Sequence, residues 1–504
     1  MEWRFRNRPE LRRTALLALC AAAAASFAAH GFLFSNEFFS HDSVSYFTYG
    51  TGTPAFYTGI GRFLIPLYEQ LKGDVAAPWL IGLLFTLWMA GTGLLAADLL
   101  EIRSRGGVAL TCALLCANMS LTLTGATYVY CMDEYAFALL CAAGAVWLFA
   151  RGRWRDAAAG VGALVVSLAV YQAYFTVAAA LCFLVILRRT AAGETLARVV
   201  RDGVRYLALL AGSFLLYYGL WGAVCAVMDV EKRRVEESLL AGGGLGRILS
   251  LVKEANVDYV SGLFDGGGVL GWLMPAVHLL LLCELVFCLW ALLRKPGLAV
   301  GNKALLAILV CLIPTAFNAV WVLMNGGATQ LMTFAGELLY LLALACREPD
   351  RGRPLPHRAG IAALLCLVLW QHVVFANQVY MKKDLEKNAA LVLAGQVIGR
   401  IEGTEGYVPG ETPVAFAGRL DHNGYLNRGR EAFRDLEGTV GLWSDTAATY
   451  NLGRYLTDYL NYPLRWDTET DFSQRREVQA MPVFPAAGSA AVVDGTVVVK
   501  LSQW

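Results

Sequence analysis

Long apolar runs alternate with short polar turns over the first three quarters of this 504-residue chain. Each run comes close to the roughly 20 residues that cross a bilayer as a helix. The pattern therefore predicts about eleven membrane-spanning helices. The expected spans are residues 14–34, 76–99, 107–125, 135–149, 156–171, 173–187, 204–228, 269–293, 302–324, 330–346 and 359–376. The short runs around Tyr171 leave this count open by one or two.

The first loop after a span, residues 35–75, combines an apolar stripe with charged residues. The stripe recurs at steps of three and four residues, which predicts an amphipathic helix at the membrane surface. Its members are Phe56, Ile60, Phe63, Leu64, Leu67 and Leu71. Arg62 falls off the stripe, and Asp42 lies about two helical turns beyond the first span. An acid, a guanidinium and an interfacial helix therefore occur together in this loop.

The last quarter of the chain is polar and rich in proline, and it predicts a small α/β domain. Residues 413–418 read as a buried strand, and Asp494-Gly495 between two short apolar runs is a strong hairpin signal. Residues 446–460 have helical spacing. We therefore expect a transmembrane domain over residues 1–376 and a second domain over residues 377–504.

The amino-acid composition supports a membrane protein. Hydrophobic residues make up 57% of the chain, charged residues only 16%, and the mean hydropathy is +0.50. These values indicate an all-α polytopic membrane protein with a small α/β domain at its end. Most of the twelve cysteines lie inside apolar runs, which argues against a disulfide framework and a metal site. The net charge of +2 is uninformative taken whole, and no nucleic-acid partner is expected.

Basic residues flank the predicted spans on one side, the side of the arginine-rich N-terminus. They are Arg4, Arg6, Arg8, Arg12, Arg13, Arg103, Arg105, Arg151, Arg153, Arg155, Arg188, Arg189, Arg294, Lys295, Arg347, Arg351, Arg353 and Arg358. Positive charge gathers on the cytoplasmic side of membrane proteins. We therefore expect a cytoplasmic N-terminus and an extracytoplasmic C-terminal domain.

Acidic residues on the opposite side are the candidates for catalysis. A carboxylate such as Asp42 can accept the proton of a hydroxyl that attacks a sugar carbon, although it could equally cap a helix. Asp133 and Glu134 end a tight turn between two spans on the same side. Ionisable groups at the edge of an apolar bundle tend to be functional, and helix N-terminal capping is the alternative for this pair.

Basic, aromatic and amide residues are the candidates for binding. Arg62 could hold a phosphate or extend to lipid headgroups. Arg233 and Arg234 could hold a lipid phosphate or form a solvated loop with the neighbouring glutamates. Tyr171 and Gln172 could bind sugar hydroxyls or belong to the aromatic belt. His41 adjoins Asp42 and is a candidate substrate contact.

Several short motifs occur in order along the chain: Asp42, Gly61-Arg62-Phe63-Leu64, Met132-Asp133-Glu134, Val170-Tyr171-Gln172-Ala173-Tyr174, Ala376-Asn377-Gln378-Val379-Tyr380 and Val497-Val498-Val499-Lys500-Leu501. Taken together, they resemble the Gtr type-II glucosyl transferase family, which modifies the O-antigen of bacteria. The likeness runs from about residue 36 to the end. Gln330 departs from it, because a basic residue is expected where the tenth span begins.

This family is similar to the GT-C glycosyltransferases that use polyprenyl-phosphate sugars. The resemblance implies a multi-pass protein of the bacterial plasma membrane that moves glucose from polyprenyl phosphate to a cell-surface glycan on the outer face. It implies inversion, with Asp42 as general base and Arg62 with a further cation on the leaving phosphate. Asp133 and Glu134 would orient the acceptor or assist the base. No cofactor or metal is indicated, and a donor synthase and a flippase would act upstream.

Three other interpretations of the pattern remain open. A transporter or flippase of lipid-linked sugars would also have many spans, but it commonly shows internal repeats and broken helices at the membrane midplane. A glycan polymerase or ligase would move whole oligosaccharides. A receptor or assembly protein fits if the acids are helix caps.

Overall fold

The computed structural model describes residues 8–40, 43–44, 54–233, 244–265, 273–348, 355–423 and 448–503. Helices of the first half are α1 (Arg8–Ser35), α3 (Pro54–Gly59), α4 (Ile65–Lys72), α5 (Pro78–Leu99), α6 (Arg105–Cys116), α7 (Met119–Tyr128), η2 (Val129–Cys131), α8 (Met132–Arg151), α9 (Trp154–Val170), η3 (Gln172–Tyr174), α10 (Phe175–Ala192) and α11 (Leu196–Val227). Those that follow are α12 (Leu245–Leu263), α13 (Leu273–Leu293), α14 (Val300–Cys311), α15 (Ile313–Phe317), α16 (Ala319–Leu323), η4 (Gln330–Met332), η5 (Phe334–Glu337), α17 (Leu338–Arg347) and α18 (Leu355–Glu402).

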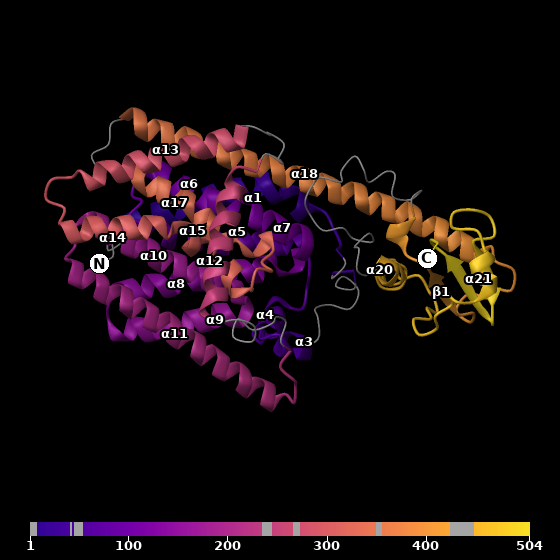
Figure 1. The fold of residues 1–504 in the computed structure, drawn as a ribbon. Helices are drawn as coiled ribbons and strands as arrows, with labels where there is room; N and C mark the ends of the chain where they lie inside the picture. Colours follow the sequence, from indigo (N-terminus) through magenta and orange to yellow (C-terminus); the bar gives the residue numbers. More distant parts are fainter. Residues whose placement is uncertain are drawn as a thin grey trace.

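These helices pack into one bundle, from which α18 runs out to the C-terminal domain (Figure 1). Within the described residues, seven helical stretches are long and apolar enough to cross a membrane. They are residues 10–35, 78–99, 105–151, 172–192, 196–227, 273–293 and 356–402. The membrane character and the mostly helical fold are thus confirmed, whereas the count of eleven spans stays a prediction. Two of the expected spans, residues 107–125 and 135–149, fall within one helical stretch.

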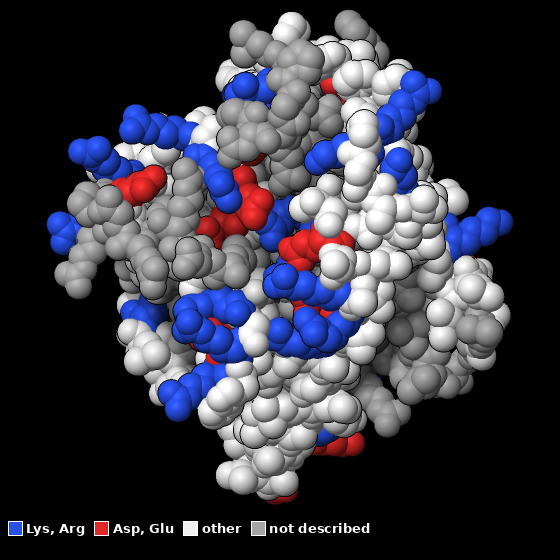
Figure 2. Space-filling view, turned by 90° about the vertical axis from the view of Figure 1, so that its left-hand side faces the viewer, with Lys and Arg blue, Asp and Glu red and all other residues white. Residues whose placement is uncertain are grey.

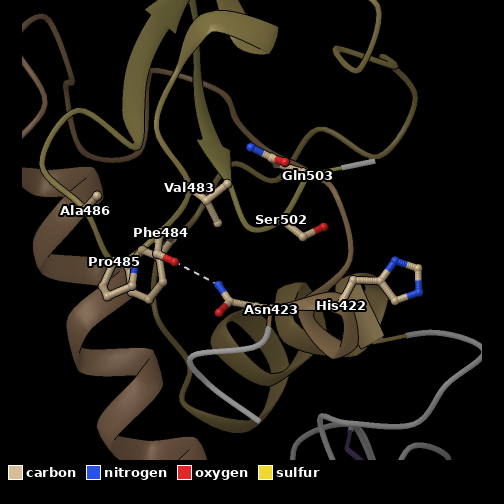
Figure 3. A pocket seen from close by; sticks show the side chains of 8 residues that line it. All are labelled: His422, Asn423, Val483, Phe484, Pro485, Ala486, Ser502 and Gln503. Carbon is tan, nitrogen blue, oxygen red and sulfur yellow. Dashed lines mark hydrogen bonds between the residues drawn. The ribbon is translucent and has the colours of Figure 1, made fainter. Parts of the chain in front are cut away.

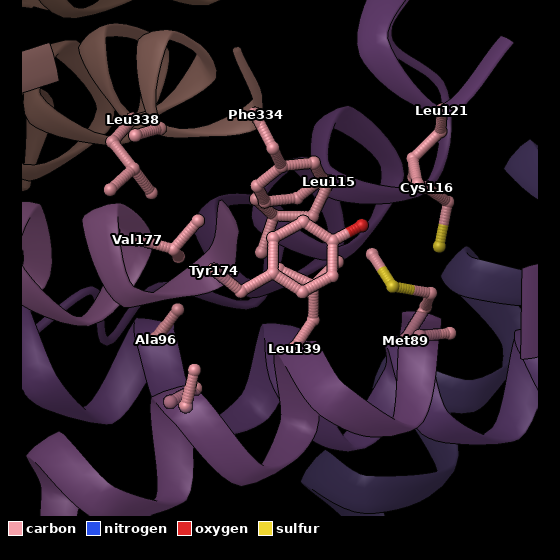
Figure 4. Close-up of a cluster of buried hydrophobic side chains, with 14 of the residues drawn as sticks. Met89, Ala96, Leu115, Cys116, Leu121, Leu139, Tyr174, Val177, Phe334 and Leu338 are labelled. Atoms are coloured by element: carbon pink, nitrogen blue, oxygen red, sulfur yellow. The ribbon is translucent and has the colours of Figure 1, made fainter. Parts of the chain in front are cut away.

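The bundle core explains why the first half of the chain is so apolar. Its side chains come from most helices of the bundle, α1 and α18 included, and Tyr174 lies among them beside Leu139, Met89 and Phe334 (Figure 4). The Tyr174 ring centroid is 4.9 Å from that of Tyr171 and 5.9 Å from that of Phe334. Burying these side chains stabilises the bundle and holds the aromatic residues that surround the candidate site.

The predicted interfacial helix is wrong in one respect, because the structure forms two short helices where the sequence suggested one. The chain turns between α3 and α4 at Gly61, whose φ of +83° is left-handed. Part of the apolar stripe packs on the bundle, whereas Leu71 of α4 is 81% exposed. A second difference is α12, an amphipathic helix in a stretch for which the sequence predicted only a loop.

The C-terminal domain contains the expected strand and hairpin. Its strands are β1 (Val414–Ala417), β2 (Ala490–Val493) and β3 (Thr496–Lys500), in the order β1-β3-β2. β1 is parallel to β3, and β2 pairs antiparallel with β3 across Asp494-Gly495. Both turn residues have positive φ, as a two-residue hairpin requires. Helical segments α20 (Ala448–Arg454), η9 (Tyr455–Tyr459) and α21 (Arg476–Ala480) complete it, with the short turn η7 (Leu420–His422).

The helix α18 belongs to both parts of the molecule. The predicted domain boundary at residues 376 and 377 falls inside this continuous helix. Its last turns carry Ala390, Leu393, Ala394 and Val397 into the hydrophobic core of the C-terminal domain. A rigid helix therefore connects the bundle to that domain.

The N-terminal end of α1 and the C-terminal domain lie at opposite ends of the bundle (Figure 1). Lys and Arg side chains gather on the end away from the C-terminal domain (Figure 2). An ion pair joins Arg188 of α10 to Glu101 of the α5–α6 loop there, and another, between Arg151 and Asp156, closes the α8–α9 connection. The buried carboxylate of Glu348 accepts hydrogen bonds from the backbone of Arg103 and Ser104, at 2.8 and 2.9 Å. Loops predicted to share one side of the membrane thus meet at one end.

Candidate active site

The turn between α3 and α4 is held by four hydrogen bonds to four consecutive backbone carbonyls. Trp221 Nε1 donates to Thr58 O at 2.7 Å, and the backbone N–H of Arg233 donates to Gly59 O at 2.8 Å. Gln172 Nε2 donates to Ile60 O at 2.8 Å, and Tyr217 Oη donates to Gly61 O at 3.0 Å. The carbonyls at the end of a helix need partners outside it, and here α11, the segment that follows it and the α9–α10 corner supply them. This fixes the position of the next residue, Arg62.

Gly61 is expected to tolerate no side chain. A Cβ there would lie 2.3 Å from Tyr217 Oη and 2.7 Å from Gln172 Nε2, in addition to the strain of a left-handed φ. We expect Gly61→Ala to lower the free energy of unfolding in detergent micelles by more than the roughly 1–3 kcal/mol typical of backbone strain alone. Gly73→Ala is the matched control, because Gly73 has a φ of +85° and no atom within 4 Å of its Cβ position. Equal losses for the two variants would contradict this prediction.

Arg62 lies between tyrosines at the inner side of this turn. Its guanidinium carbon is 5.1 Å from the Tyr171 ring centroid and 5.9 Å from the Tyr135 centroid, and Nη1 donates to Tyr135 Oη at 2.9 Å. The Tyr135 and Tyr171 rings stack at 4.1 Å. The Nε atom is buried and has no acceptor among the described residues, and no described carboxylate forms an ion pair with Arg62. A fixed guanidinium of this kind fits a phosphate.

Next to Arg62 lies a cluster of buried charges. Asp133 and Glu134 begin α8 and are fully buried. Lys72, the last residue of α4, lies with Nζ 3.2 Å from Asp133 Oδ1 and 3.6 Å from Glu134 Oε1, and its side chain is only 2% exposed. Tyr68 Oη donates to Asp133 Oδ2 at 3.1 Å. Burial and the Asp133 charge raise the pKa of Tyr68, so its hydroxyl stays protonated and acts as the donor.

The structure brings together most of the residues that the sequence singled out. Arg62, Asp133, Glu134 and Tyr171 all lie around the start of α8. Gln172 is adjacent, but its amide nitrogen is engaged by Ile60 O and by Tyr217 Oη at 2.9 Å. It therefore holds the turn.

Arg233 reaches the same turn from the segment that follows α11, with its guanidinium carbon 5.6 Å from the Phe56 ring centroid. His41, Asp42 and Arg234 lie outside the described residues. Residues 330–332, where a basic residue was expected, form the short helix η4.

Lys72, Tyr68 and Tyr135 are site residues that sequence reasoning missed. Tyr135 directly follows Glu134, which the sequence had already indicated as a candidate site residue. Lys72 lies four residues after Tyr68, so the two side chains share one face of the predicted amphipathic helix. A cation on that face was the sequence signal for Lys72. Glu69 is also buried and lies within electrostatic range of Glu134. Helix α4 therefore brings one acid, Glu69, and one cation, Lys72, close to α8.

The C-terminal domain carries a separate depression of about 610 Å³. His422, Asn423, Phe484 and Ser502 line it together with Val483, Pro485, Ala486 and Gln503 (Figure 3). Asn423 Nδ2 donates to Phe484 O at 2.8 Å and to Leu501 O at 2.7 Å, so this amide holds the walls together. The depression lies in the C-terminal domain, apart from the Arg62 site at the bundle.

Across the residues that the structure describes, no group of three or more His, Cys, Asp or Glu side chains is arranged to hold a metal ion. Asp133 contacts Lys72 and Tyr68 directly, and Glu134 lies within electrostatic range of both Asp133 and Glu69.

The fold and the site define a helical membrane protein in which buried acids and an arginine held between two tyrosines lie around the start of α8. The family model described as Glucosyl transferase GtrII matches residues 31–343, more than half of the chain. The chain belongs to this glucosyl transferase family, which confirms the resemblance seen in the sequence. The motifs near residues 376 and 497 lie beyond the matched residues. No curated protein and no solved structure matches the chain.

Proposed function

We propose that this protein transfers glucose from polyprenyl-phosphate-glucose to a hydroxyl of a cell-surface glycan such as O-antigen. The proposal places it in the bacterial plasma membrane with eleven spans, a cytoplasmic N-terminus and a GT-C type of fold. Its main support is Arg62, a guanidinium held between two tyrosines without a carboxylate partner among the described residues, in a glucosyl transferase. A cation at this position would stabilise the charge that grows on a departing phosphate.

In the proposed reaction the acceptor oxygen attacks the anomeric carbon of glucose from the face opposite the phosphate. The carbon–oxygen bond to the phosphate breaks as the new glycosidic bond forms, so the configuration inverts. Asp42 takes the proton of the acceptor hydroxyl. The phosphate leaves with the electron pair of the broken bond, and Arg62 stabilises its growing charge. Arg233 and Arg234 are the further cations proposed for this phosphate, with His41, Tyr171 and Gln172 around the sugars.

Asp133 and Glu134 have a less direct place in this proposal. Both are fully buried, and Lys72 lies between them. We assign them two roles, which are to orient the acceptor and to hold α4 against α8. Holding α4 also keeps Arg62, which lies just before it, in position. The C-terminal domain would form part of the acceptor groove, and a donor synthase and a flippase would supply the lipid-linked sugar.

The deciding experiment is a transfer assay with purified protein in detergent. Radiolabelled polyprenyl-phosphate-glucose is mixed with a cell-surface glycan fraction, and label in the glycan is counted. Transfer of label supports the proposal. Movement of the donor across vesicles without any transfer would instead support a flippase, and transfer of intact oligosaccharides would support a polymerase or ligase.

Arg62 variants test the phosphate assignment. We expect Arg62→Met to lower kcat/KM for the donor about 10- to 100-fold, the equivalent of the roughly 1.5–3 kcal/mol of a hydrogen bond to a charged group. Arg62→Lys keeps the charge but loses the planar fork, and we expect an intermediate loss. Arg198→Met is a control, because the Arg198 side chain is 59% exposed at the opposite end of the bundle. If kcat/KM for the donor is unchanged in Arg62→Met, Arg62 does not bind the donor phosphate.

A further inference from the structure

Residues on both sides of His41 and Asp42 in the sequence are fixed to the bundle and to each other. The hydroxyl of Ser40 donates to the carbonyl of Thr127, near the end of α7. The backbone N–H of Ser40 donates to Ser43 Oγ at 2.7 Å, and the backbone N–H of Ser43 donates to Ser40 O at 3.2 Å. Ser40 and Ser43 are each 1% exposed. These hydrogen bonds tie the start and the end of a four-residue segment together.

The C-terminal domain holds the same segment from the other side. The Phe39 ring centroid lies 4.7 Å from that of Tyr455 and 5.0 Å from that of Tyr459. Phe39 and the fully buried Val44 belong to one hydrophobic cluster with Leu456 and residues of α18. Phe39 and Val44 thus pack in the core of a domain that lies at the far end of the sequence.

A buried lysine completes this arrangement. Lys383 of α18 donates from Nζ to Phe39 O at 2.8 Å, and its side chain is 2% exposed. Glu386, one turn along, lies 3.9 Å from the ammonium. Removing an ammonium from water is costly unless its hydrogen bonds are made. The buried Lys383 ammonium therefore holds the Phe39 carbonyl in a defined position.

We propose that Lys383 is a positioning residue for the catalytic loop and fixes the backbone ahead of Asp42. Phe39, whose ring packs on the C-terminal domain, gives the loop its second anchor. This inference rests on the proposed function, in which Asp42 is the base. Its physical reason is that a displacement of about 1 Å in a catalytic group can lower a rate roughly 100-fold. The C-terminal domain then takes part in placing the base, in addition to contacting the acceptor.

The test compares Lys383→Met, Lys383→Arg and wild type in the transfer assay, with folded protein quantified by gel filtration. Methionine has a similar length but donates no hydrogen bond. We expect Lys383→Met to lower kcat about 10- to 100-fold, with the donor KM changed less than twofold. Lys383→Arg, which keeps a charged donor, is expected to recover part of kcat. Lys387→Met is the matched control, because Lys387 lies 5.7 Å from the Phe38 ring centroid, where methionine still packs on the aromatic ring.

A double variant separates this inference from the proposed function. If Lys383 acts through Asp42, Lys383→Met should lower the residual rate of Asp42→Asn less than twofold, because the base is already missing. A multiplicative loss in the double variant, or a full wild-type kcat in Lys383→Met, would overturn the positioning role. Asp42→Asn with wild-type activity would overturn the proposed base.

A second variant covers the case in which Lys383→Met does not fold. Phe39→Leu keeps the backbone carbonyl but loses the packing on Tyr455 and Tyr459. We expect it to lower kcat with an unchanged donor KM and to show the same lack of additivity with Asp42→Asn. Wild-type kinetics in Phe39→Leu would contradict the anchoring of the loop by the C-terminal domain.

Discussion

Asp42→Asn is expected to lower kcat for glucosyl transfer by about 100- to 10,000-fold, the range that a positioned general base contributes. Asparagine has the shape of aspartate but cannot take the proton of the acceptor hydroxyl. The donor KM should stay within twofold of wild type, because the proposed phosphate contacts come from Arg62 and other cations. Radiolabel transfer with purified protein measures both quantities.

The variant should fold normally, because the anchors of the loop are made by other residues. Phe39 packs on Tyr455, the hydroxyl of Ser40 donates to Thr127 O, and Val44 belongs to the same buried cluster as Leu456. Glu37→Gln is the matched control, an acid-to-amide change at an exposed position of the same loop. If Asp42→Asn retains a tenth or more of the wild-type rate, the base is another residue, and Glu134 is the first to examine.

Lys72→Met is expected to lower the free energy of unfolding by about 3–5 kcal/mol, the loss typical when one partner of a buried ion pair is removed. The substitution leaves Asp133 and Glu134, both fully buried, without the cation that lies between them. Equilibrium unfolding in mixed detergent micelles, followed by circular dichroism, measures the change. Lys253→Met, at an exposed position of α12, is the control and should shift stability by less than about 0.5 kcal/mol.

The pH dependence of this loss follows from the pKa of Lys72. Burial lowers that pKa, but the charges of Asp133 and Glu134 raise it by more, so it lies above the ordinary 10.5. A lysine whose pKa is raised on folding stabilises the protein fully below its unfolded pKa. The stabilisation is lost only as the pH rises through the folded value. Lys72 therefore stays charged at pH 6 and at pH 8, and its ionisation should make no difference between the two.

Two results would contradict the role assigned to Lys72. A loss below about 1 kcal/mol would mean that the acids are neutralised in some other way. A double variant with Asp133→Asn should recover part of the stability, because it removes one of the charges left unpaired. If the two substitutions were simply additive, Lys72 and Asp133 would not interact energetically.

Local sequence patterns were sufficient to predict much of the architecture. Apolar runs of bilayer length identified the helices of the bundle, because burial in lipid requires them in the sequence itself. Asp494-Gly495 predicted the hairpin between β2 and β3, because only a few residues adopt positive φ easily. Short motifs such as Met132-Asp133-Glu134 were enough to indicate the family, because they can be read without knowing which segments pack together. The sequence by itself thus determined the membrane class, the C-terminal domain and the glucosyl transferase family.

The contacts of the site were decided only by the tertiary structure. Lys72 and Asp133 are 61 residues apart, and Lys383 and Phe39 are 344 apart, so no local period links either pair. Even the break between α3 and α4 depends on distant residues, because Tyr217 and Gln172 bind the turn that Gly61 makes. Hydrophobic periodicity records which face of a segment is buried but not which segment covers it. Packing alone determined which charges meet.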